Sequence, residues 1–313
     1  MRRAATWLVV GGLLLVGGIA TVEILLRDGD DRAESRPART SPQSLPAQLE
    51  AAGARGLLYV GVEEGGECML RAIRLPSLVV ESIFEVWDCQ FAIGAAGQVA
   101  SGSDCRGTSA LATPDGATVD LFEGCAPAWK PDGELTFVRD GNVMTVPRSC
   151  TRSINACSSV ALSKQEIRRS LETVSGLRSP VLREIAWLDA SRMAAILRDR
   201  GDFVVVFEGR RLAAAPTFGS GMLSRLVVDR TNRRIVVVMG GEIQDAFVLD
   251  AAGAFVAGLE APVPAVVSVA LSPDGAWAAA AGRASVVVFQ LDKPQGRAFQ
   301  LPFEAEALAW RGP

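Results

Sequence analysis

Short apolar runs separated by turn residues fill the chain from Gly56 onward. The runs are rich in Val, Ile and Phe, which suit a pleated, half-buried strand. Gly-rich and Asp-Gly segments between them are typical of tight turns. The strand-like runs cover 57–62, 68–75, 135–140, 202–209, 234–239, 246–250 and 285–292. The pattern therefore predicts an all-β domain.

One hairpin unit recurs along this domain. Its clearest copies are CAPAWKPDGELTFV at 125–138 and SVALSPDGAWAAAA at 268–281, and weaker copies start at Cys89, Glu184 and Ser224. In the Pro-Asp-Gly segments, Pro presets φ, Asp bonds the local backbone and Gly accepts a positive φ. These segments are therefore interpreted as turns between two strands and not as calcium-binding or catalytic loops.

The spacing of the hairpin unit predicts the number of sheets. The apolar residue that ends the first strand recurs about every 40 residues, which is the length of one four-stranded propeller blade. These residues are Ile93, Trp129, Trp187, Val228, Leu271 and Trp310.

The last unit, EALAWRGP, supplies a single strand, whereas 57–83 supplies three strands without a leading one. Pairing the two ends completes a sixth blade and leaves no open sheet edge at the closure. We therefore predict a six-bladed β-propeller over 56–313.

The segments AWKPDGELTFVRDGNVMTV and VALSPDGAWAAAAGRASVVVF resemble the repeat of TolB-type, WD-like six-bladed propellers, whose blades carry A-x-S-P-D-G-x-x-I-A-F. The resemblance covers about Leu57–Pro313 as architecture and is close in two units. It implies a periplasmic or envelope protein that binds other proteins, although some related propellers are domains of peptidases. An anchor and a linker stand where TolB has its amino-terminal α/β domain, so the specific partners of TolB do not carry over.

Six cysteines occur between residues 68 and 157. An even number behind an export signal favours disulfides and an oxidising compartment. The blade pattern places the first two cysteines on one face of the ring, repeats that relation for the next two, and puts the last two in a small loop on the opposite face. The predicted pairs are Cys68–Cys89, Cys105–Cys125 and Cys150–Cys157. Spread spacing and the lack of C-x-x-C disfavour a metal site.

The step from Trp129 to Trp187 is 58 residues, longer than the others. Ser163 and Glu166 have capping-box spacing, which predicts a helix at about 164–173 within an insertion at about 160–176, on the face of the first two disulfides. Basic residues surround this helix. These residues are Arg168, Arg169, Arg178 and Arg183. They form a candidate docking patch for an acidic partner; the alternative is a solvated helix face.

Residues 4–22 form a run of 19 uncharged residues, long enough for about 28 Å of bilayer core. We predict a cytoplasmic tail at 1–3 and a transmembrane signal anchor at 4–26; the alternative is a cleaved signal peptide ending near Gly18-Ile19-Ala20. Residues 27–55 predict a flexible linker with a short helix at 45–54. The expected location is the cell membrane, as a single-pass protein with its C-terminal domain outside the cytoplasm.

The chain contains no histidine, which excludes Ser-His-Asp and Cys-His nucleophiles and His-ligated metals. A net charge of −3 disfavours nucleic-acid binding, and no cofactor is expected. The enzyme alternative is a calcium-dependent propeller hydrolase or lactonase with carboxylates at the channel mouth. Its candidates, whose spacing forms no recognisable catalytic set, are Asp88, Glu184, Asp189 and Asp229.

These patterns favour a non-enzymatic, membrane-tethered propeller of a bacterial cell envelope that binds a protein, peptide or other ligand outside the cytoplasm. A third hypothesis is a sensor that reports through its anchor. The predicted tail of three residues is too short for a signalling domain, so a sensor would need a membrane partner.

Overall fold

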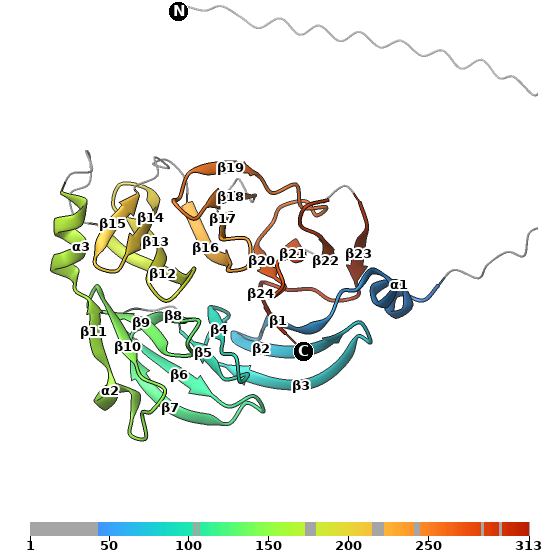
Figure 1. Ribbon diagram of the computed structural model, residues 1–313. Coiled ribbons are helices and arrows are strands. Elements are labelled where there is room, and N and C mark those ends of the chain that lie inside the picture. Colours follow the sequence, from blue (N-terminus) through green and yellow to red (C-terminus); the bar gives the residue numbers. More distant parts are fainter. Residues whose placement is uncertain are drawn as a thin grey trace, which may run out of the picture. The chain divides into compact units, whose positions relative to one another are not determined.

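The computed structural model describes residues 43–102, 105, 107–172, 180–214, 222–240, 245–282, 285–293 and 296–312. Within the compact unit Gln43–Pro313, these residues form six four-stranded antiparallel sheets. The first strand of each sheet contacts the first strands of the two neighbouring sheets, which closes a ring (Figure 1). The predicted six-bladed propeller is confirmed.

The blades are numbered here along the chain, each from its innermost to its outermost strand. Blade 1 is β4 (Phe91–Ile93), β5 (Val99–Ser101), β6 (Thr108–Ala112) and β7 (Thr118–Glu123). Blade 2 is β8 (Cys125–Trp129), β9 (Leu135–Arg139), β10 (Asn142–Val146) and β11 (Ser159–Leu162). Blade 3 is β12 (Val181–Trp187), β13 (Arg192–Arg198), β14 (Asp202–Glu208) and β15 (Arg211–Ala214).

The remaining blades follow the same order. Blade 4 is β16 (Met222–Asp229), β17 (Arg234–Gly240), β18 (Ala246–Asp250) and β19 (Phe255–Gly258). Blade 5 is β20 (Ser268–Leu271), β21 (Trp277–Gly282), β22 (Ser285–Gln290) and β23 (Ala298–Leu301). Blade 6 is β24 (Ala307–Arg311), β1 (Gly56–Glu64), β2 (Glu67–Leu75) and β3 (Val79–Val86).

Blade 6 joins the two ends of the ring as the sequence predicts. β24 pairs antiparallel with β1, with Trp310 opposite Leu58 and Leu308 opposite Val60. All four of these side chains are buried. The closing pairing therefore also completes the apolar layer that blades 5 and 6 share.

Each pair of neighbouring blades shares one cluster of buried apolar residues. A blade is thus covered on both faces, so its middle strands are apolar without alternation. The Val204–Phe207 segment of β14 illustrates this, because its side chains are divided between the clusters shared with blade 2 and blade 4. This explains the continuous Val-rich runs in the sequence.

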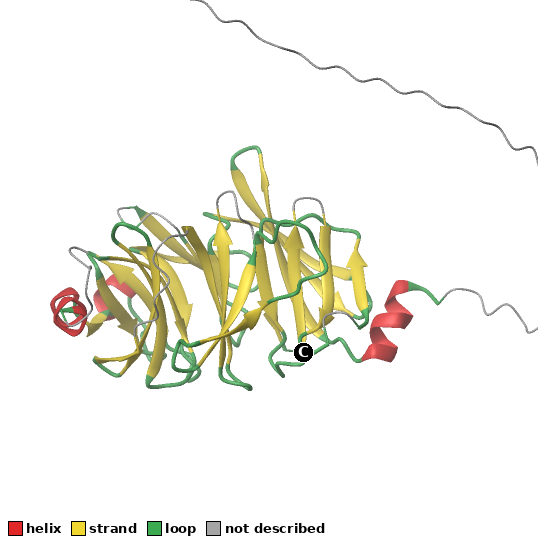
Figure 2. Cartoon of the chain, turned by 90° about the horizontal axis from the view of Figure 1, so that it is seen from above, coloured by secondary structure: helices red, strands yellow, loops and turns green. Residues whose placement is uncertain are grey.

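The loops gather on two faces of the propeller, as Figure 2 shows. We call the face with the Pro-Asp-Gly turns the hairpin face. Gly133 and Gly275 in those turns have φ of 86° and 69°, and the Asp132 Oδ1 atom accepts the Glu134 N–H at 3.0 Å. The predicted turn chemistry is therefore present.

We call the opposite face the disulfide face. It carries Cys68–Cys89, which joins blade 6 to the segment before blade 1, and Cys105–Cys125, which joins blade 1 to blade 2. The third bridge, Cys150–Cys157, closes the loop before β11 on the hairpin face and includes the short helix α2 (Ile154–Cys157). All three predicted pairings are present.

The helix α1 (Leu45–Ala52) corrects the predicted linker boundary. Leu49 is fully buried in the apolar cluster between blades 5 and 6. The compact unit therefore begins at Gln43 and not at residue 56. The helix predicted at 45–54 lies at this position.

The predicted anchor at 4–26 lies outside the described residues, and none of the helices described is long and apolar enough to span a bilayer.

The predicted insertion helix is α3 (Lys164–Leu171), and its capping box is formed. The Ser163 hydroxyl accepts the Glu166 N–H at 3.2 Å, and the Glu166 carboxylate accepts the Ser163 N–H at 2.8 Å. Ile167 and Leu171 are buried between blades 2 and 3. The helix begins at the disulfide face and contacts β15 at the outer edge of blade 3.

Candidate functional site: the central channel

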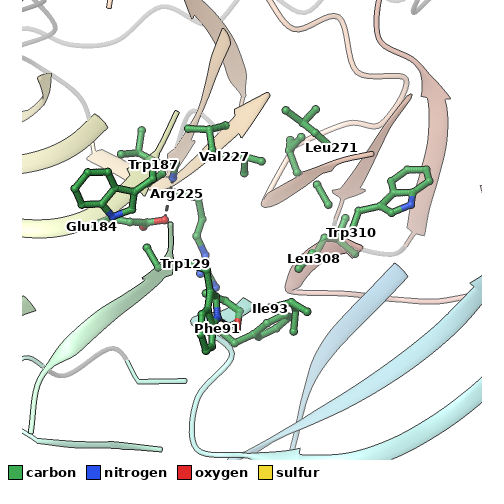
Figure 3. Close-up of a pocket in the computed structure, with 18 of the residues that line it drawn as sticks. Phe91, Ile93, Trp129, Glu184, Trp187, Arg225, Val227, Leu271, Leu308 and Trp310 are labelled. Atoms are coloured by element: carbon green, nitrogen blue, oxygen red, sulfur yellow. Dashed lines mark hydrogen bonds between the residues drawn. The ribbon is translucent and has the colours of Figure 1, made fainter. Parts of the chain in front are cut away.

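The innermost strands of all six blades surround a cavity of about 360 Å³ on the propeller axis. This volume is in the range of small-molecule sites. Most of the side chains that line it are apolar, and Figure 3 shows Phe91, Ile93, Val227, Leu271 and Leu308 around it. The apolar walls leave a few polar side chains to determine what the channel can bind.

Two β-bulges direct charged side chains to this channel. In β12 the pairing register shifts between Leu182 and Glu184, and in β16 it shifts between Leu223 and Arg225. A bulge adds one residue to a strand and changes the direction of the side chains that follow it. The leucines remain buried in the clusters between blades, whereas Glu184 and Arg225 line the channel.

Gln90, Glu184 and Arg225 form what we call the channel polar cluster. One oxygen of Glu184 accepts the Leu226 N–H at 2.9 Å, and the other accepts the Gln90 side-chain amide at 3.4 Å. Arg225 Nη2 donates to the Cys89 carbonyl. These bonds connect blades 3 and 4 with the segment before blade 1, and Figure 3 shows Glu184 beside Arg225.

The environment of Glu184 favours its neutral form. The side chain is only 9% exposed, and this burial raises its pKa from 4.5 to about 7. The charge of Arg225 and the hydrogen bonds from Leu226 and Gln90 act in the opposite direction. The carboxyl group therefore changes its charge close to neutral pH.

A second arginine lies at the hairpin-face end of the channel. Arg230 donates from Nε to the Trp187 carbonyl at 3.1 Å and from Nη2 to the Trp129 carbonyl at 2.6 Å. Partial burial lowers its pKa from the ordinary value. Arg230 thus connects blade 4 to blades 2 and 3 across this end.

The tryptophans that the spacing analysis singled out also connect elements. Trp129 Nε1 donates to the Ala92 carbonyl at 3.3 Å, and Trp187 Nε1 donates to Thr136 Oγ1 at 2.8 Å. Each of these indoles reaches the blade that precedes its own. The sequence indicated where the indoles lie but not these partners.

The four carboxylates of the enzyme alternative do not converge. Only Glu184 lines the channel. Asp189 accepts the N–H groups of Ser191 and Arg192 at 2.8 Å in a hairpin-face turn of blade 3. Asp229 accepts the Asn232 N–H at 2.9 Å in the corresponding turn of blade 4. The described ranges hold no group of three or more His, Cys, Asp or Glu residues that could bind a metal ion.

The structure brings two of the predicted docking arginines into one region. Arg168, exposed on α3, lines a groove on the disulfide face together with Val181 and Leu182 of β12, and the next residue of β12 is the exposed Arg183. Arg169 is exposed on α3 outside the groove lining. Arg178 lies outside the described residues. Lys164, which the sequence analysis did not include, also lines this groove.

Comparison with known proteins identifies the fold. No family model matches the chain, and no curated protein matches it. In contrast, 831 chains of solved structures match it. One is TolB from Acinetobacter baumannii, with a TM-score of 0.52 and 14% identity over 85% of this chain and 70% of that chain. The similarity shows a TolB-like β-propeller, and since such a fold hosts many functions, the function has to be inferred from the sites.

Proposed function

We propose that this protein is a membrane-tethered, extracytoplasmic β-propeller that binds an acidic protein partner in the cell envelope. The observation that carries this proposal is the groove between α3 and β12, because it has the exposed Arg168 and Lys164 in its lining, the exposed Arg183 next to it in β12, and a rigid support. The TolB-like fold is consistent with a protein-binding scaffold.

The support of the groove is built into the local sequence. Ile167 and Leu171 fix α3 between two blades, and Glu166 forms an ion pair with Arg210 at 3.0 Å in addition to the capping box. A helix held in this way loses little conformational freedom when a partner binds. Loops and insertions on a rigid scaffold are common positions for binding residues.

The composition of the groove defines the partner. Val181 is 53% exposed and lines the groove together with Arg168, and the exposed Arg183 follows two residues later in β12. Exposed apolar surface beside arginines is typical of the centre of protein interfaces, where Arg pairs with carboxylates in a bidentate geometry. An acidic segment with one or two apolar residues therefore fits best.

The docking proposal is tested by crosslinking in intact cells of the native host, followed by purification of the tagged protein. The expected result is a defined partner that is recovered with the wild type and lost with R168E/R183E. R152E, an exposed arginine in the loop on the hairpin face, is the matched control and should retain the partner. Equal recovery with R168E/R183E and the wild type would exclude the groove.

The proposed tether is supported by the apolar run at 4–22 and by the disulfides, which form in oxidising compartments. Its test is carbonate extraction of membranes, together with thiol labelling of the denatured protein. The full chain should remain in the membrane fraction with all six cysteines oxidised. Release by carbonate, or free thiols in freshly isolated protein, would contradict this location.

A further inference from the structure

Within the channel polar cluster, Glu184 and Arg225 already bind a donor and an acceptor from a single short segment of the chain. Cys89 presents its carbonyl to Arg225, and the adjacent Gln90 presents its side-chain amide to Glu184. A guanidinium and a carboxylate that line the same channel thus hold an acceptor and a donor from two adjacent residues. A free α-amino acid presents the same two groups, a carboxylate and an ammonium, with full charges.

Both charged side chains have hydrogen-bonding capacity left. In the described part of the chain only Nη2 of Arg225 has a protein partner, and each oxygen of Glu184 accepts one bond. Nor do the two side chains form an ion pair with each other or with any other described residue within 4.0 Å. Carboxylate oxygens can accept further bonds, and a guanidinium has five N–H donors.

Exchange of the internal partners for a charged ligand is physically reasonable. The bond between Gln90 and Glu184 is long at 3.4 Å. An ammonium would replace this neutral contact by a charge-assisted bond, which is shorter and stronger. A ligand carboxylate would likewise replace the Cys89 carbonyl on Arg225.

We propose that the central channel binds a small zwitterion with an aliphatic side chain, such as a free aliphatic α-amino acid. Its ammonium binds Glu184, its carboxylate binds Arg225, and its side chain lies against channel walls such as Ile93, Val227 and Leu308. The cavity of about 360 Å³ has room for such a molecule. This site is separate from the groove beside α3 and does not depend on the protein partner proposed above.

The buried state of Glu184 supplies an independent signature of this binding mode. Because its pKa lies near 7, part of the carboxyl groups are protonated at neutral pH. The charged side chain that faces it is Arg225 of β16, and its other partners, Leu226 N–H and Gln90, are neutral. An ammonium beside the carboxylate lowers its pKa, so binding at pH 7 should release protons.

The test uses the full chain in detergent micelles and calorimetric titration at pH 7 with L-leucine. Isopentylamine lacks the carboxylate of leucine, and isocaproate lacks its amine. Leucine should bind at least about tenfold more tightly than either analogue, because only leucine carries both the ammonium for Glu184 and the carboxylate for Arg225. Repeating the titration in buffers with different ionisation enthalpies measures the released protons.

Two variants and a matched pair complete the experiment. E184Q keeps the shape of the side chain and should lose about tenfold or more in leucine affinity and all proton release. R225K keeps the positive charge but not the planar fork and should weaken leucine and isocaproate binding alike. The controls are E208Q and R192K, which alter an ion pair at the hairpin-face end of blade 3 and should leave binding unchanged. Thermal unfolding confirms that each variant is folded.

Three results would overturn the proposal. These are no heat with leucine up to about 10 mM, equal affinity for leucine and isopentylamine, or unchanged leucine binding by folded E184Q. Failure here would leave the docking groove untouched, because that proposal is tested with different residues and a different readout.

Discussion

Blade 1 and blade 3 have the same four-stranded design but are held in the ring by different means. The two inner strands of blade 1, β4 and β5, have three residues each, whereas β12 and β13 of blade 3 have seven each. Blade 1 is joined by a disulfide to each neighbour. The chain contains no cysteine after Cys157, so blade 3 has no such bridge.

The difference indicates that covalent bridges compensate for a small blade. Short strands form few ladder hydrogen bonds and bury little apolar surface. Blade 3 instead relies on buried side chains shared with both neighbours, on the hydrogen bond from Trp187 to Thr136, and on the Glu184 bond to Leu226. The two blades should therefore respond differently to reduction, core truncation and pH.

The largest effect is expected when both bridges of blade 1 are removed. The bridges close loops with sequence separations of 21 and 20, so each should stabilise the fold by about 3 kcal/mol in the chain-entropy model. In C68A/C89A/C105A/C125A, hydrogen exchange should accelerate most in β4 to β7 and least in β13. Urea unfolding measures the loss of stability.

The control for this experiment is C150A/C157A, which opens a loop with a separation of only 7 and should cost about 2 kcal/mol. Equal acceleration of exchange in blades 1 and 3 after removal of the blade 1 bridges would mean that the ring unfolds as one unit. The comparison between the two blades would then be wrong.

Truncation of the core of blade 3 should have the next largest effect. Phe207 in β14 is fully buried, and F207A should lower the free energy of unfolding by about 3–5 kcal/mol, because a large cavity remains. V119A, an exposed position in β7 of blade 1, is expected to change stability by less than about 0.5 kcal/mol. A loss below about 1 kcal/mol in F207A would show that packing does not hold blade 3.

The stability of blade 3 should also depend on pH, because Glu184 is buried in it. Because the folded pKa of Glu184 lies above the unfolded value of 4.5, the folded state binds more protons between about pH 4.5 and 7. Its contribution to stability is therefore present at low pH and is lost as the pH rises through about 7. The full change is about 3 kcal/mol.

E184Q should remove this dependence, so that the variant equals the wild type near pH 4.5 and exceeds it by up to about 3 kcal/mol at pH 8. Urea unfolding of both proteins across this range measures the difference. A difference that stays constant from pH 4.5 to 8 would show that the carboxyl group is charged throughout. The disulfides of blade 1 contribute no comparable slope, since they do not titrate.

The sequence predicts the turns and disulfides better than it predicts the channel, for a physical reason. Turn residues and cysteines have local constraints, so Pro131-Asp132-Gly133 and the pair Cys105–Cys125 follow once the repeat is recognised. The channel polar cluster joins the Cys89-Gln90 segment with residues 94 and 136 positions later, and no local signal predicts the bulges before Glu184 and Arg225. The packing of Leu49 against blades 5 and 6 was likewise hidden by the polar composition of the segment before it.

The smallest effect, and the one that separates the helix from the blade beneath it, is expected for the N-cap of α3. S163A removes the acceptor for the Glu166 N–H and should cost about 1 kcal/mol. Ile167 and Leu171 remain buried, so blade 3 should keep its hydrogen-exchange protection while the amides of α3 lose part of theirs. S170A, which removes only a 3.4 Å contact to the Arg210 carbonyl, is the matched control and should leave both unchanged. If S163A also lowered the protection of β13, the capped end of α3 would stabilise blade 3 itself, and the helix and the blade would unfold together.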